Sequence, residues 1–90
     1  MNSEEIQKFL TNNKISDKKM LKITFRKRNP VYGVFVQFKD AEELQAKNFW
    51  RIVSLTNYKE WETSKDINLS RIFNGSDFSK LAIEAQPSLA

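Results

Sequence analysis

The spacing of apolar residues changes along the chain from a helical repeat to an alternating one. Ile6, Phe9 and Leu10 stand three and four positions apart. This spacing predicts one apolar face of a short helix over about residues 3–12. We expect Ser3 to cap the helix, with the acidic pair that follows it in the first turn. Because a stripe this short is not stable alone, the helix should pack on a sheet.

From Met20 onward the pattern is that of β-strands. Leu21, Ile23 and Phe25 alternate with polar residues, which is typical of a strand with one face in solvent. The strand after them is apolar on both faces and contains Gly33, which marks a bend or a close approach of another backbone. In all, four further strands are predicted, at residues 31–38, 48–53, 67–73 and 78–83.

The segments between the predicted strands are polar. Residues 40–47 favour a loop or a helical turn, and residues 56–66 favour an extended loop or a ragged hairpin. Asn74-Gly75 is a strong signal for a tight hairpin in which both residues adopt positive φ.

These elements predict a mainly β fold: a short N-terminal helix followed by a five-stranded, strongly bent antiparallel small barrel. The length of 90 residues suits one domain. We place this domain at residues 1–84, with the barrel over about 20–83 and a frayed tail at 85–90. A strongly curved sheet encloses a core with few residues, which a chain of this size requires.

The composition argues against several kinds of chemistry. The chain has no cysteine and no histidine, so it lacks disulfides, thiolate ligands, the commonest zinc ligand and the usual general base. Four of its eleven carboxylates stand in the adjacent pairs Glu4-Glu5 and Glu42-Glu43, as expected of solvated positions. We therefore predict a chain that is not an enzyme and that holds no metal and no cofactor. A carboxylate-based enzyme is the third-ranked alternative.

The start of the sequence does not resemble a signal peptide, because Glu4 and Glu5 stand where a signal is basic. No apolar run approaches the roughly 18 residues that a membrane span needs. The sequence therefore predicts a cytoplasmic protein without membrane contact.

Positive charge is concentrated in the first third of the chain. Residues 1–28 hold eight basic and three acidic side chains, whereas residues 29–90 hold seven and eight. Such a cluster indicates a surface for a polyanion. The alternative is a solvated strand edge that lysine protects against aggregation. The basic patch consists of Lys18, Lys19, Lys22, Arg26, Lys27 and Arg28.

Two segments of the chain resemble the motifs of a known family. The run 31–40 is a strand with an internal glycine that ends in Asp40, and Asn48 opens the next strand. This arrangement resembles the first motif of the Sm-like (Lsm) family. The run 67–81, in which apolar residues lead into a glycine turn and a final apolar strand, resembles the second motif. The preceding helix also fits the family, so the resemblance covers about residues 3 to 83.

The resemblance implies a site for single-stranded RNA, whose unstacked bases offer faces and edges to a protein. Asp40 would brace a loop, Asn48 would read a base edge, and Asn74 with Gly75 would form the second loop. The family also joins neighbouring subunits by pairing their fourth and fifth strands, which implies a homo-oligomer.

Three departures from the family pattern concern the same site. Asp40 and Asn48 are further apart than in the family, Asn74 stands where the family has an arginine, and Asn29-Pro30 replaces a turn glycine. Each site residue also has a structural alternative: a hairpin turn for Asn74-Gly75 and a cap of the following turn for Asp40.

The leading functional hypothesis is a non-catalytic Sm-like barrel that binds single-stranded RNA and associates with copies of itself. The alternative is a small-barrel module that binds another protein and no nucleic acid. Its contacts would be Tyr58 and Trp61, two aromatic residues in a polar segment where burial is not assured.

Overall fold

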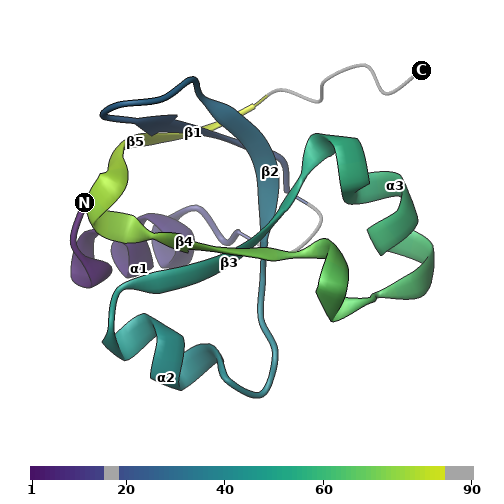
Figure 1. Ribbon diagram of the computed structural model, residues 1–90. Coiled ribbons are helices and arrows are strands. Elements are labelled where there is room, and N and C mark those ends of the chain that lie inside the picture. Colours follow the sequence, from purple (N-terminus) through teal and green to yellow (C-terminus); the bar gives the residue numbers. More distant parts are fainter. Residues whose placement is uncertain (16–18, 85–90) are drawn as a thin grey trace.

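The protein folds as an N-terminal helix followed by a five-stranded antiparallel sheet, with two more helices between the strands (Figure 1). The computed structural model describes residues 1–15 and 19–84. Lys18 of the basic patch and the predicted tail at 85–90 lie outside the described residues. The helices are α1 (Ser3–Asn12), α2 (Ala41–Ala46) and α3 (Leu55–Ser64), and the 3-10 turns are η1 (Ile67–Leu69) and η2 (Gly75–Asp77). The strands are β1 (Leu21–Phe25), β2 (Val31–Val36), β3 (Phe49–Ser54), β4 (Arg71–Asn74) and β5 (Phe78–Ile83).

Helix α1 forms where the apolar stripe predicts it, but Asn2 caps it instead of Ser3. The Asn2 side chain accepts a hydrogen bond from the Glu5 backbone, and the Glu5 carboxylate accepts one from the Asn2 backbone. This reciprocal pair satisfies two of the free N–H groups at the start of the helix. Ser3 is left free to bond across the fold, and its hydroxyl donates to the Gln45 carbonyl at 2.7 Å. Ile6 at the centre of the stripe is fully buried.

The strands lie in the order β4-β3-β2-β1-β5, so β4 and β5 form the two edges. Strand β1 pairs with β2 on one side and with β5 on the other, where Ile23 lies opposite Leu81. The register shifts between Thr24 and Phe25, as at a β-bulge, which increases the local bend and twist. The sheet curves strongly but β4 does not pair with β5 (Figure 1), so the barrel is not closed. With about a third of the chain in strands, the fold is mixed α/β and not mainly β.

The two faces of the sheet bury two separate apolar clusters. The inner face holds the larger one, built from Ile6, Leu21, Ile23, Phe25, Phe35, Trp50, Ile52, Phe78 and Leu81. The outer face of β2 and β3 is covered by α3 and holds Met20, Val34, Val36, Val53 and Trp61. Strand β2 is therefore buried on both faces, as its apolar pattern predicts. A Cβ on Gly33 would lie 2.6 Å from the Val53 carbonyl oxygen, which explains the glycine as a close backbone approach.

Helix α3 stands where the sequence predicts an extended loop or ragged hairpin. Leu55, Tyr58 and Trp61 follow one another at three-residue intervals, so they share one side of the helix. That side packs on the outer face of the sheet, while the polar residues between them face solvent. The helix ends at Lys65, which adopts a left-handed φ of 52°. The segment 67–69 likewise forms the 3-10 turn η1 and not the start of a strand.

Candidate functional site

The side-chain amide of Asn48, which was expected to read a base edge, forms hydrogen bonds within the chain through both its nitrogen and its oxygen. It lies between α2 and β3 with a left-handed φ of 62°. Its Nδ2 donates to the Met1 carbonyl at 3.0 Å, and its Oδ1 accepts from Trp50 Nε1 at 2.9 Å. The Asn48 side chain therefore joins the N-terminal segment to β3.

The Asn74-Gly75 turn is packed against Asn48 and is not a hairpin of the predicted type. Asn74 has φ −84° and Gly75 does not adopt positive φ, which corrects the prediction for both residues. Asn74 caps η2 instead, because its side-chain oxygen accepts hydrogen bonds from the backbone and hydroxyl of Ser76. Gly75 is buried, and its N–H donates to the Asn48 carbonyl at 2.8 Å. A Cβ on Gly75 would collide with the Asn48 amide and lie 2.6 Å from Ile6 Cδ1.

Asp40 forms an ion pair and does not cap the turn that follows it. Its two carboxylate oxygens accept from Arg51, at 3.2 Å from Nε and at 2.6 Å from Nη2. Arg51 also donates to the Ser70 hydroxyl at 3.3 Å and lies over the ring of Phe38. The hydrogen bonds from Arg51 hold the pKa of Asp40 below its ordinary value, and they raise the pKa of Arg51.

The two aromatic residues expected to be exposed belong to the outer cluster. Trp61 is 4% exposed, and its ring meets that of Phe38 edge-on with 5.6 Å between centroids. Lys65 Nζ lies 5.1 Å from the centre of the Trp61 ring. Tyr58 is half-buried beside it. Both residues therefore serve to attach α3 to the sheet.

These contacts overturn the partners predicted from the sequence, which were RNA, another protein and copies of the chain itself. The amide expected to read a base is occupied by Met1 and Trp50, and the tryptophan expected to anchor a protein is buried. Pairing between subunits was expected at the two edge strands. However, β4 has four residues between two 3-10 turns, and β5 carries an exposed lysine, Lys80. Short edges and edge lysines both oppose strand pairing, so the ring assembly is wrong as well.

The described part of the basic patch divides into two surfaces. Lys22 lies on the outer side of β1, where its neighbours across the strands are Tyr32 and Ala82. Lys19 precedes the strand and is exposed. Arg26, Lys27 and Arg28 instead occupy the exposed connection between β1 and β2.

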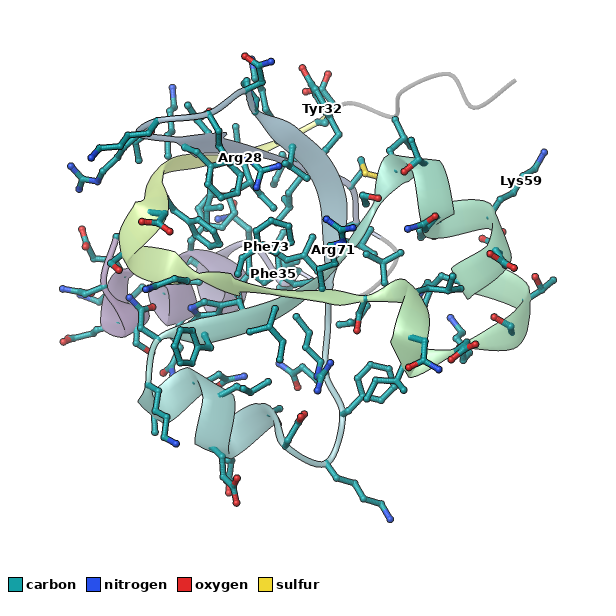
Figure 2. The ribbon with its side chains drawn as sticks, in the orientation of Figure 1. Arg28, Tyr32, Phe35, Lys59, Arg71 and Phe73 are labelled. Carbon is teal, nitrogen blue, oxygen red and sulfur yellow. The ribbon has the colours of Figure 1, made fainter. Side chains whose placement is uncertain are left out.

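A hollow of about 330 Å³ lies beside this connection, and we call it the basic groove. In Figure 2, Arg28 lies beside Phe73, which belongs to the edge strand β4. The connection is tied to η2 by one backbone hydrogen bond, from the Arg26 N–H to the Asp77 carbonyl at 3.0 Å. The basic groove is lined by Phe25, Arg26, Lys27, Arg28, Phe73 and Asp77.

Arg28 covers two aromatic rings in the basic groove. Its Cζ lies 5.1 Å from the centre of the Phe25 ring and 5.8 Å from that of Phe73. The two rings are 5.7 Å apart and tilted by 46°. Within residues 1–15 and 19–84, no carboxylate forms an ion pair with Arg26, Lys27 or Arg28. The basic groove thus combines unpaired cations with a partly buried aromatic surface.

The sequence identified the three cations but missed Phe73 and Asp77. Both lie more than forty positions further along the chain. The curvature of the sheet brings Phe73 of β4 next to Phe25 of β1, and the pairing of β5 with β1 brings Asp77 to the groove. No local pattern around residues 73–77 signals a ligand, because a partly buried phenylalanine in a strand is an ordinary core residue.

Comparison with protein-family models, with curated proteins and with solved structures finds no match to this chain. Within the residues described, no helix has the length and apolar character to cross a membrane. In the same residues, the metal-ligating side chains nowhere gather in a group of three that could hold an ion.

Proposed function

We propose that this chain is a non-catalytic binding domain whose site is the basic groove and whose ligand is an anion. The observation that carries the proposal is the combination of a 330 Å³ hollow with three consecutive cations that have no carboxylate partner among the described residues. Cations confined at the mouth of a hollow raise the local potential and attract anions. A bound anion would also relieve the repulsion between neighbouring positive charges.

The residues of the basic groove suit an oxyanion in particular. Arg26 and Arg28 each offer a planar fork of donors that matches phosphate or carboxylate oxygens, and Lys27 adds a mobile point charge. Among the residues that the structure describes, Asp77 is the one carboxylate that lines the groove. The chain has neither histidine, the most frequent general base, nor cysteine, the strongest side-chain nucleophile, which supports binding without catalysis.

The Sm-like relationship also stays a proposal, with the sheet as an open and divergent form of that barrel. Two features support it: the helix that precedes the sheet, and the strand order that leaves β4 and β5 at the edges. The proposed anion site does not depend on this relationship. Its three cations lie outside the segments that resemble the family motifs, and only Phe73 and Asp77 lie within them.

Titration with inorganic pyrophosphate tests the function. We expect amide resonances of residues 25–28, 73 and 77 to shift in a saturable way. Replacing Arg28→Glu should weaken the binding by about tenfold or more, since it removes a cation and adds a repelling anion. Lys59→Glu is the matched control, because it changes the net charge equally on an exposed residue of α3 that points away from the groove (Figure 2). This control should change affinity by less than about twofold.

Unfolding curves of both variants establish that each remains folded. Absence of saturable shifts at about 10 mM pyrophosphate would reject the proposal, since binding weaker than this is of the order expected from non-specific charge attraction. Equal weakening by Arg28→Glu and Lys59→Glu would reject it too, because affinity would then follow net charge and not the groove.

A further inference from the structure

The basic groove offers a ligand two different kinds of surface. One kind is flat: the ring of Phe73, which is partly buried, and the guanidinium of Arg28, which is exposed on its outer side. The other kind is charged: the side chains of Arg26 and Lys27, next to each other in the connection. A simple anion such as phosphate would use the charged groups of the groove, Arg28 included, and leave the ring of Phe73 without a function.

The guanidinium of Arg28 lies over the ring of Phe73, at a distance shorter than the two would need to hold a planar ring between them. A base between two plates needs them about 7 Å apart, which is twice the contact distance of roughly 3.5 Å. Cζ of Arg28 already lies 5.8 Å from the centre of the Phe73 ring. Because Arg28 is an exposed side chain without an ion pair among the described residues, an outward movement of about 1–2 Å weakens only its cation–π contacts with Phe25 and Phe73, which are small at exposed sites.

We infer that the ligand of the basic groove is a free nucleotide, with its base between Arg28 and Phe73 and its phosphates on Arg26 and Lys27. Aromatic rings and arginine planes are the surfaces on which unstacked bases are held in proteins. Asp77, at the η2 side of the groove, is an acceptor for a sugar hydroxyl or a base amino group. A volume of about 330 Å³ is at the lower end of small-molecule sites and suits a single nucleotide.

The inference rests on the proposed function, and its test separates the two. Binding of inorganic pyrophosphate is compared with binding of nucleoside diphosphates, which carry the same two phosphate groups plus a sugar and a base. We expect the nucleoside diphosphates to bind about tenfold tighter or more, because stacking of one base is a substantial and sequence-tolerant gain.

Phe73→Leu should remove this gain, so that the nucleoside diphosphates bind this variant no tighter than pyrophosphate does. Phe38→Leu is the matched control: Phe38 is also a partly buried ring with an arginine Cζ at 5.8 Å, but it lies outside the groove. Arg28→Lys is a second route to the same result if Phe73→Leu does not fold. Lysine keeps the positive charge but lacks the planar guanidinium. The variant should therefore lower the affinity for nucleoside diphosphates more than the affinity for pyrophosphate.

The possible outcomes are distinct. If pyrophosphate binds and the nucleoside diphosphates bind no tighter, the nucleotide inference is wrong and the anion site stands. If neither ligand binds, the proposed function itself is wrong. If Phe38→Leu lowers the nucleotide gain as much as Phe73→Leu does, the base does not lie in the basic groove and the inference is overturned.

Discussion

Two arginines of this chain lie over phenylalanine rings, one beside α2 and one in the basic groove. The Cζ atom of Arg51 is 5.8 Å from the centre of the Phe38 ring, and that of Arg28 is the same distance from Phe73. The carboxylate of Asp40 accepts two hydrogen bonds from Arg51, whereas no carboxylate in the described residues pairs with Arg28. A cation over a ring is therefore a candidate ligand site only where the chain leaves its charge unpaired.

The same contrast extends to Asn48 and Gly75, whose contacts also lie within the chain. We call Asp40, Asn48, Arg51 and Gly75 the closed region, because each one is committed to a contact within the chain. Variants in the closed region should therefore change stability and leave ligand affinity alone. Variants of the exposed cations of the basic groove should change affinity with little effect on stability.

The largest effect on stability is expected at Gly75. Gly75→Ala places a methyl group against the Asn48 amide and 2.6 Å from Ile6 Cδ1, both of which are held by their own contacts. We expect a loss of about 3 kcal/mol in the free energy of unfolding, measured by urea denaturation. Arg28→Ala in the basic groove should lose less than about 1 kcal/mol, because an exposed cation–π contact contributes little. Equal losses would erase the distinction between the two regions.

A smaller loss is expected at Asn48. Asn48→Ala leaves the indole N–H of Trp50 without its acceptor. It also places alanine at a left-handed φ of 62°, which asparagine tolerates better than alanine does. We expect about 2 kcal/mol of destabilisation. Asn48→Gly should recover about 1 kcal/mol of this, because glycine adopts the left-handed conformation without strain. Pyrophosphate affinity should stay within about twofold in both variants, and a selective loss of binding without a loss of stability would show that Asn48 faces a ligand.

The strands and the first helix could be predicted from the sequence because their signals are local. Alternation of Leu21, Ile23 and Phe25 with polar residues shows which side of β1 is buried. The apolar run 31–36 shows that β2 is buried on both faces. Helix α3 was missed although Leu55, Tyr58 and Trp61 have helical spacing. A ten-residue helix with three apolar residues depends on tertiary packing, and its packing surface lies on β2 and β3.

The turn and the site could not be predicted because distant residues decide them. Asn74-Gly75 has the composition of a tight hairpin, but Asn48 and Ile6 pack against Gly75 and a 3-10 turn forms instead. Likewise, the cations at 26–28 were visible in the sequence, whereas Phe73 reaches them only through the curvature of the sheet, which brings β4 near β1. Local composition therefore indicated the charge of the site and not its shape.

The smallest effect on stability is expected for the ion pair between Asp40 and Arg51. The hydrogen bond from Arg51 lowers the pKa of Asp40 in the folded chain below its value in the unfolded chain. The resulting stabilisation is present above the unfolded pKa of about 3.9 and is lost as the pH falls through the lowered folded pKa. We therefore expect the unfolding midpoint of the wild type to approach that of Asp40→Asn as the pH is lowered from about 6 to about 3. Differential scanning measurements across this range follow the convergence. The matched control is the same substitution in an Arg51→Gln background, where Asp40 has lost its hydrogen-bond donor. There, the difference in unfolding midpoint between the chains with and without Asp40→Asn should depend less on pH. If the curves of wild type and Asp40→Asn stay parallel down to about pH 3, Arg51 is not paired in solution, and its charge is as available to a ligand as that of Arg28.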